Sequence, residues 1–404
     1  MSDVRVAITG MGQISALGTG RDEMWSAIER GHCGIRNHTL SVGDFSLEIP
    51  AGLVENFDPL QHFREDELLL RDPYALFAII AAREAMKGAG LPDAGFVPER
   101  AGVILGSGAG GEHAREAAAW RFLGEGKARC NPVLVPRTNH QASVGFTSME
   151  LGITGPSMVV ATGCASSNHA MSQAWLMIKQ GMLDIAITGG SDSNVVYTNV
   201  KAFDALRVLA RDTCRPFSAE RKGMVMGEGA GVLILENMDR ARKRGTNIIA
   251  ELAGVGMSAD ATDPVHPAAK GPAQAIKAAL KSANLSPDQV EYINAHGTGT
   301  PVNDAEECKA IRLALGPAAE KIALSSTKSM HGHALGGVGG LELVATLLGM
   351  KNGALPPCAN YIGPDPDCDL DIVANVPRER KIDVALSNAF AFGGLNAVLA
   401  IKSV

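Results

Sequence analysis

The sequence has few aromatic residues, no closely paired cysteines and little net charge. Aromatic residues make up 4% of the 404 residues, which leaves little surface on which nucleic-acid bases could stack. The seven cysteines are scattered without a CxxC spacing, so neither a disulfide framework nor a zinc site is predicted. The net charge of −6, with acids and bases interspersed, argues against a sequence-independent nucleic-acid binder.

Long hydrophobic runs are also absent. No apolar stretch reaches the roughly 18–20 residues that a membrane-spanning helix needs. The opening segment up to Gly10 resembles a strand that enters a turn, and it has no apolar signal-peptide core. We therefore expect a cytoplasmic protein with reduced thiols that binds neither membrane nor nucleic acid.

The apolar content of 46% and the 46 glycines are sufficient for a large, closely packed core. Short β-type runs alternate with helical patterns, and this alternation predicts parallel or mixed sheets covered by helices. The expected strands are 4–8, 101–105, 158–161, 185–189, 231–236, 248–255, 290–294, 322–325 and 384–387.

Two pairs of segments repeat weakly along the chain. Residues 81–91 and 275–285 share an alanine-rich pattern, each followed by a strand and a Gly-x-Gly turn, and residues 227–235 resemble residues 393–401. Chance similarity between alanine-rich helices is the alternative to duplication. Duplication predicts a site at the seam between two related halves. The two halves would be residues 1–250, which carry the cysteine described next, and residues 251–404.

Cys164 lies between an apolar run and a helical pattern of small residues, in the segment Ala161–Asn168. A cysteine at a helix N-terminus experiences the positive end of the helix dipole and free backbone N–H groups, and both favour the nucleophilic thiolate. The same N–H groups can hold the oxyanion that forms when a thioester carbonyl is attacked. The alternative is a buried, inert cysteine.

Two histidine loops follow downstream. His296 ends a predicted strand and opens the turn Gly297–Pro301, and His333 lies in the glycine-rich segment Lys328–Gly340. Two imidazoles beside one thiolate can polarise a thioester carbonyl and stabilise an enolate. The alternatives are satisfied core histidines, or a metal pair at His331 and His333 that lacks carboxylate or cysteine partners at ligand spacing.

Lys328 precedes these histidines in a mostly apolar setting. A buried ammonium needs an acidic partner. Three carboxylates in the adjoining segments are candidates for this structural support: Asp304, Glu307 and Glu342. The alternative is an exposed lysine on a loop.

Gly106–Gly111 fits the GxGxxG pattern, follows a predicted strand and precedes a helix, as a dinucleotide site requires. No acidic residue ends a following strand at the spacing of about 20 residues that such a site uses. The match is weak in a chain with 46 glycines. We therefore expect no nicotinamide or flavin cofactor.

Together these segments resemble the β-ketoacyl-acyl carrier protein synthases of the thiolase superfamily, in particular the type II enzymes of fatty-acid and polyketide assembly. The order Cys…HGTGTP…STKSMHGH…FGG carries the resemblance, which extends nearly end to end from Ile8. It implies an α/β, thiolase-like fold with two duplicated βαβαβ-type halves in five layers (αβαβα).

The resemblance also implies an acyltransferase reaction. Cys164 would accept an acyl chain from the phosphopantetheine arm of an acyl carrier protein. Malonyl-carrier protein would then lose CO2 and extend the chain by two carbons as a β-ketoacyl thioester. His296 and His333 would bind the malonyl thioester carbonyl, while Lys328 and Glu342 would order the site.

Further roles follow from the same resemblance. The backbone N–H groups of Cys164 and Phe392 would form the oxyanion hole, and the Phe392 ring would gate acyl entry. Thr298 and Thr300 would hydrogen-bond the pantetheine amides. No cofactor or metal is implied, because loss of CO2 drives the step and the carrier protein supplies the thioester.

The sequence departs from the family pattern at several positions. Gly163 replaces a frequent alanine before the cysteine, which suggests a looser turn, and Leu395 replaces the threonine of the usual FGGTN loop. His331 replaces the usual threonine of STKSxTGH and has no assigned role. Ala109 stands where elongating enzymes often carry a larger aliphatic residue, so we expect a deeper or wider acyl pocket, with Phe203 also lining it.

The surface expected to dock the carrier protein is also unusual. Acids replace some of the basic residues that the family carries near residues 64–71, while Arg71 and Arg207 remain as candidate docking residues. A thinned basic patch favours a dedicated acidic carrier, although these charges could simply be solvated. The family implies a homodimer, or a heterodimer with a chain-length-factor-like homologue.

Two rival functions remain. The first is a non-condensing, chain-length-factor-like subunit, which would typically lack the nucleophilic cysteine that Cys164 supplies here. The second is other acyl chemistry, such as that of a thiolase. A thiolase uses a second catalytic cysteine near the C-terminus, and residues 388–396 contain none. The acyl chain and the pathway are not predicted.

Overall fold

The computed structural model describes residues 4–55 and 57–404, and most of its strands belong to two sets. The first set is β1 (Val6–Ser15), β5 (Ala101–Gly106), β6 (Met158–Val160), β7 (Ile185–Ser193) and β8 (Glu228–Asn237). The second set is β9 (Ala250–Ala259), β10 (Tyr292–Asn294), β11 (Ala323–Ser325), β15 (Val384–Ala391) and β16 (Leu395–Lys402). Every strand expected from the sequence lies at or within a few residues of one of these.

The two sets have the same strand order and direction. The first runs β6-β5-β7-β8-β1 and the second runs β11-β10-β15-β16-β9. In each set the first two neighbouring pairs in this order are parallel and the last two are antiparallel. This agreement confirms the expectation of two similarly built halves. The segments 227–235 and 393–401, which resemble each other in sequence, occupy the corresponding strands β8 and β16.

Helices form three layers around the two sets. The outer layer of the first half contains α3 (Pro73–Gly88) and α7 (Ala142–Leu151), and that of the second half contains α11 (Lys270–Ala283) and α12 (Pro301–Leu315). Between the halves lie α8 (Ser166–Lys179) and α14 (Val338–Asn352), which contact strands of both. Residues on every side of α14 are buried from Val338 to Gly349, as expected for a helix in a central layer. The αβαβα order is confirmed.

The two halves are joined where β1 pairs with β9, through Ala7 opposite Glu251 and Ile8 opposite Ala250. The first strand of the second half, β9, begins at Ala250, the position at which the sequence analysis divides the chain. A hydrophobic core made of residues from both halves, among them Met171, Val338 and Leu399, surrounds the central helices.

Smaller elements complete the structure. The remaining helices are α1 (Arg21–Glu29), α2 (Glu65–Leu70), α4 (Leu91–Ala94), α5 (Glu112–Ala119), α6 (Leu134–Thr138), α9 (Tyr197–Ala205), α10 (Met238–Lys243) and α13 (Lys328–His331). The remaining strands are β2 (Gly18–Thr19), β3 (Arg36–Val42), β4 (Phe45–Ala51), β12 (Ala354–Leu355), β13 (Asp371–Ile372) and β14 (Arg378–Glu379).

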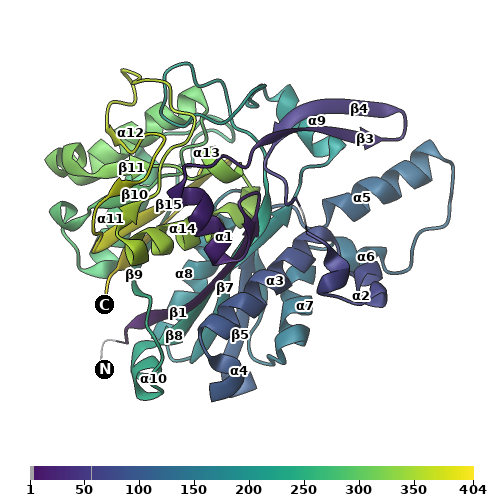
Figure 1. The fold of residues 1–404 in the computed structure, drawn as a ribbon, viewed down its shortest axis with the longest axis horizontal. Helices are drawn as coiled ribbons and strands as arrows, with labels where there is room; N and C mark the ends of the chain where they lie inside the picture. Colours follow the sequence, from purple (N-terminus) through teal and green to yellow (C-terminus); the bar gives the residue numbers. More distant parts are fainter. Residues whose placement is uncertain (1–3, 56) are drawn as a thin grey trace.

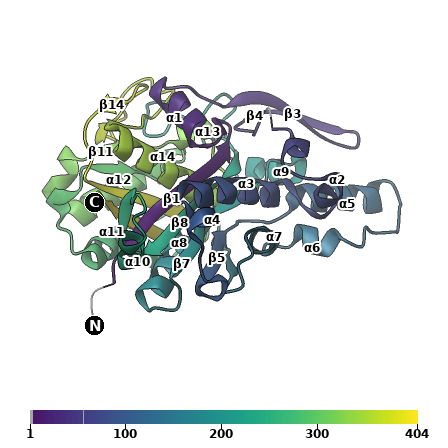
Figure 2. The same ribbon diagram turned by 60° about the horizontal axis from the view of Figure 1, so that its bottom comes forward.

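The β3–β4 hairpin was not expected from the sequence. It projects from the body together with α5 and α6 (Figures 1 and 2), and Phe45 at its tip packs edge-on against Trp120. Among residues 4–55 and 57–404, no helix is both long and apolar enough to cross a bilayer.

Candidate active site

Cys164 follows β6 and comes directly before Ala165, the N-cap residue of α8. The turn is built around Gly163, whose φ of +58° lies in the left-handed region. An alanine in this conformation carries strain of about 1–2 kcal/mol. Gly163 adopts this conformation without that strain. The Ser166 hydroxyl holds the turn by donating to the Gly163 carbonyl at 2.6 Å, so the structure gives no sign of the looser turn expected from this glycine.

The two histidine loops converge on this cysteine. The Cys164 sulfur, a ring nitrogen of His296 and a ring nitrogen of His333 all lie within 4.8 Å of one another. The two imidazole rings are 5.5 Å apart and nearly perpendicular. Zn²⁺ accepts these donor types, and the trio is the one such cluster of His, Cys or carboxylate ligands within the described residues.

The ionisation of the trio differs from the expectation of a thiolate. Burial raises the pKa of the Cys164 thiol to about 11, and the nearby Lys328 charge opposes this shift only in part. Burial and the Lys328 charge hold the pKa of His296 and His333 well below the usual range. The resting site therefore contains a neutral thiol beside two neutral imidazoles, and the thiol needs one of them to take its proton.

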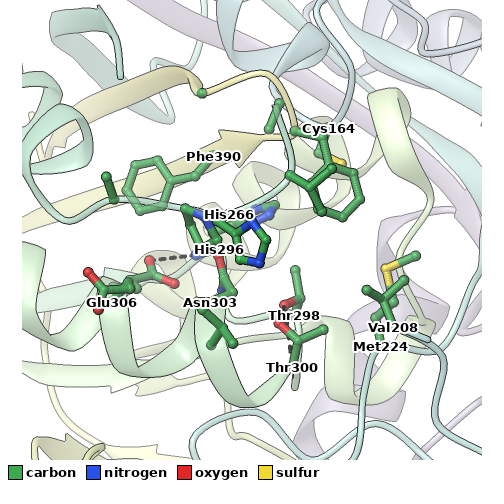
Figure 3. Close-up of a pocket in the computed structure, with 18 of the residues that line it drawn as sticks. Cys164, Val208, Met224, His266, His296, Thr298, Thr300, Asn303, Glu306 and Phe390 are labelled. Atoms are coloured by element: carbon green, nitrogen blue, oxygen red, sulfur yellow. Dashed lines mark hydrogen bonds between the residues drawn. The ribbon is translucent and has the colours of Figure 1, made fainter. Parts of the chain in front are cut away.

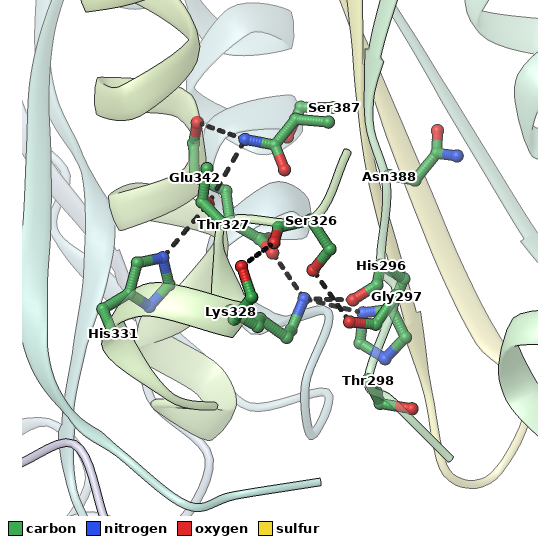
Figure 4. A network of polar contacts seen from close by, with 12 residues as sticks. His296, Gly297, Thr298, Ser326, Thr327, Lys328, His331, Glu342, Ser387 and Asn388 are labelled. Carbon is green, nitrogen blue, oxygen red and sulfur yellow. Dashed lines mark hydrogen bonds and ion pairs between the residues drawn. The ribbon is translucent and has the colours of Figure 1, made fainter. Parts of the chain in front are cut away.

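Lys328 is fully buried and forms an ion pair with Glu342 of α14 (Figure 4). Its ammonium also donates to the His296 carbonyl at 2.5 Å and lies 3.4 Å from His296 Nδ1. Because an ammonium can only donate, Nδ1 of His296 is the acceptor and Nε2 carries the proton. Lys328 thus fixes both the position and the tautomer of His296.

Asp304 and Glu307 do not pair with Lys328, contrary to one reading of the sequence. Glu307 instead accepts the backbone N–H groups of His296 at 2.8 Å and Gly297 at 2.7 Å. Asp304 accepts the backbone N–H groups of Phe217 and Gly299. Both carboxylates project from α12, so this helix holds the His296 loop in place. Their structural role is as expected, but their partners differ.

A cavity of about 350 Å³ leads from the surface to the trio (Figure 3). Thr298 and Thr300 lie on its wall with their hydroxyl oxygens 2.9 Å apart. Phe392 also lines it and is 41% exposed, so the ring has room to move. Phe390, which sequence reasoning did not single out, packs its ring 5.9 Å from that of His296. Its position two residues before Phe392, near the end of β15, was the available signal.

The Gly393–Gly394 loop is held despite the loss of the family threonine at Leu395. The Gly393 N–H donates to Pro264, and Asn396 donates to Asp260 at 2.8 Å. The Asp260 N–H in turn donates to the Gly394 carbonyl. The usual hydrogen bonding is therefore replaced by contacts to the segment after β9.

The two candidate docking residues have different surroundings. Arg207 is exposed and lines the cavity mouth. Arg71 is buried, with its guanidinium between the Phe63 and Phe146 rings and an ion pair to Glu67. This burial and cation–π packing argue against a docking role for Arg71, while the docking role of Arg207 stays a prediction.

The two acyl-pocket candidates lie outside the cavity that opens to the surface. Phe203 packs against the same hydrophobic cluster as Cys164, which includes Met226 and Leu335. Ala109 is half-buried and follows Gly108, whose N–H donates to the buried Asp192. Both therefore stay predictions for the acyl pocket.

The sequence matches the N-terminal domain of β-ketoacyl synthase over residues 3–241 and its C-terminal domain over residues 249–362. The chain belongs to the β-ketoacyl synthase family. It is 45% identical to Nodulation protein E of Rhizobium sp. (strain N33), over the full length of both chains. It is 38% identical to 3-oxoacyl-[acyl-carrier-protein] synthase 2 of Staphylococcus aureus (strain MRSA252), covering 99% of this chain and 98% of that protein.

Solved structures agree with this assignment. The ishigamide ketosynthase/chain length factor matches this β-ketoacyl synthase with a TM-score of 0.93 and 33% identity, covering all of both chains. A type II polyketide ketosynthase, AntDE, in complex with its acyl-carrier protein AntF, matches with a TM-score of 0.89 and 31% identity over the same coverage. The protein is a ketosynthase that transfers acyl groups, and its fold is that of the thiolase superfamily.

Proposed function

We propose that this ketosynthase carries out decarboxylative condensation at the Cys164–His296–His333 trio. The observation that carries the proposal is the convergence of these three side chains at the end of one cavity. The Lys328–Glu342 ion pair behind them supports it. Reconstitution with an acyl-carrier thioester and malonyl-carrier protein tests it: a 3-oxoacyl product two carbons longer, together with CO2, is expected.

The first stage is acyl transfer to sulfur. In our proposal His333 takes the thiol proton of Cys164, because neither of its ring nitrogens has a hydrogen-bond partner among the described residues. The sulfur attacks the acyl thioester, and the backbone N–H groups of Cys164 and Phe392 hold the oxyanion. The carrier thiol leaves with the proton. The flanking amides of Gly393 and Gly394 are already engaged, which leaves this role to Phe392.

The second stage is condensation. Malonyl-carrier protein loses its carboxylate as CO2, and the electron pair left behind forms an enolate held by N–H donors from His296 and His333. The enolate carbon attacks the acyl-Cys164 carbonyl, and the sulfur leaves and is reprotonated. Thr298 and Thr300 hydrogen-bond the pantetheine arm. In this scheme no cofactor or metal takes part.

Two partners belong to this proposal. Acyl carrier protein docks at the cavity mouth, and a second ketosynthase chain, identical or of the chain-length-factor type, covers the edge strand β6. Met158 on this strand and Met149 on α7 are exposed, and exposed apolar side chains next to an unpaired edge favour pairing. The seven free cysteines fit a reducing, cytoplasmic location.

Substitution of Arg207 by glutamate tests the docking surface. We expect the KM for malonyl-carrier protein to rise about tenfold, because a charge at the mouth steers an acidic partner, with kcat unchanged. The same variant is expected to leave reaction with a carrier-free pantetheine thioester unaffected. Equal losses with both substrates would argue against a docking role.

Substitution of Ala109 by isoleucine tests the acyl pocket. We propose that the small side chain leaves room for a long, unsaturated or bulky chain, in a specialised fatty-acid or polyketide pathway. The variant keeps the catalytic residues, so its profile across acyl-carrier thioesters is expected to shift to shorter chains by at least two carbons. An unchanged profile, measured by intact mass of loaded enzyme, would refute the pocket assignment.

A further inference from the structure

His331 has a place in the site that the reaction scheme leaves unused. It ends the short helix α13, three residues after Lys328 and two before His333, and it is fully buried. Its Nδ1 lies 2.8 Å from the Gly332 carbonyl oxygen, and its Nε2 lies 3.1 Å from the Thr327 hydroxyl (Figure 4). Both ring nitrogens are therefore engaged in hydrogen bonds.

These partners define the tautomer of the ring. A carbonyl oxygen only accepts, so Nδ1 of His331 carries the proton and Nε2 accepts from the Thr327 hydroxyl. Burial lowers the pKa of His331 to about 3. The ring thus stays neutral under physiological conditions, and it is a fixed hydrogen-bonding group with no part in proton transfer.

The contact to Gly332 acts on the peptide that leads into His333. Gly332 has a φ of +73°. Glycine enters and leaves this left-handed conformation easily because it has no side chain, so the peptide that follows can change its orientation. His331 holds the carbonyl of the Gly332–His333 peptide, while the N–H of the same peptide donates to the Val225 carbonyl at 2.7 Å. The peptide plane is therefore fixed at both ends.

This restraint matters because the His333 ring has no hydrogen bond of its own among the described residues, whereas His296 is held by Lys328. The other side of His331 connects to the His296 loop. The Thr327 hydroxyl also accepts, at 3.4 Å, from Asn294, which lies two residues before His296.

We propose that His331 is a positioning residue that orients His333 and ties its loop to that of His296. The inference rests on the proposed function. It predicts a loss in both stages, since His333 takes the thiol proton in the first stage and donates to the enolate in the second. A misplaced catalytic group can cost up to about 100-fold in rate.

The test compares His331→Leu with His331→Asn. Asparagine reproduces the Nδ1–H donor to Gly332, and leucine removes both hydrogen bonds with similar volume. For H331L we expect acyl loading of Cys164 and single-turnover condensation of the preloaded enzyme both to be slowed about 10- to 100-fold. H331N is expected to recover most of that loss. Loading is followed by intact mass, condensation by CO2 release.

Two results would overturn the inference. They are loading and condensation by H331L at the wild-type rates, and an equal loss in H331N. If H331L does not fold, H331N decides the matter: normal loading and near-normal condensation support the inference, and a loss of condensation contradicts it. Failure of the wild-type protein to load or condense would instead refute the proposed function itself.

Discussion

Replacement of Cys164 by alanine is expected to abolish acyl loading and to lower condensation by roughly 10³-fold or more. The reason is that the described site brings this one thiol, and no other, within reach of both imidazoles. Intact mass after incubation with an acyl-carrier thioester measures loading, and the 3-oxoacyl product measures condensation. A C164A protein that loads as well as wild type would rule out this nucleophile.

Cys130 provides the matched control because it is an exposed free cysteine outside the site. C130A is expected to load and condense normally. The raised pKa of the Cys164 thiol, about 11, adds a pH dependence to alkylation. Since the thiolate is the reactive form, alkylation of Cys164 in the free enzyme should accelerate as the pH rises from 7 to 10. A rate that is constant across this range would contradict a protonated resting thiol.

The second large effect is expected from Lys328→Met. It leaves Glu342 buried without its cation, which destabilises a protein by about 3–5 kcal/mol, and it removes the group that fixes His296. Urea unfolding measures the free energy of unfolding, and condensation is expected to be lost as well. If K328M unfolds at the wild-type urea midpoint, the Lys328–Glu342 ion pair does not contribute to the free energy of unfolding as described.

The double variant Lys328→Met/Glu342→Leu separates stability from activity. Replacing both charges by apolar groups is often neutral, so most of the lost stability should return while condensation stays low. The pH gives a further check. Burial raises the pKa of Glu342 to about 7, above its usual value of about 4.5, so protonation favours the folded state. Without Lys328, the stability of K328M is therefore expected to decrease as the pH rises from 5 to 8.

The chemistry of the site could be predicted because its residues lie in short local motifs. Cys164, His296 and Lys328 each lie within four residues of the end of a strand, and the carboxyl ends of parallel strands meet at one edge of a sheet. The repeat at 227–235 and 393–401 then predicted that two such edges face each other. The order of these motifs was enough to identify the residues, although their distances were not.

What the sequence did not predict depends on partners that are distant along the chain. Arg71 was assigned to the docking surface because it lies in the segment where the family carries basic residues, and the rings that cover it, Phe63 and Phe146, come from separate parts of the chain. Likewise, the ionisation of Cys164 depends on how deeply it is buried, and burial outweighs the nearby Lys328 charge here. Neither effect has a signal in local sequence.

The common strand order of the two halves has a consequence for how the site is assembled. Cys164 follows β6, the third strand of the first half, and Lys328 and His333 follow β11, the third strand of the second half. These are counterpart positions in the two halves. The first half supplies the nucleophile there and the second supplies a cation and a base, so neither half alone holds the groups that the proposed reaction needs.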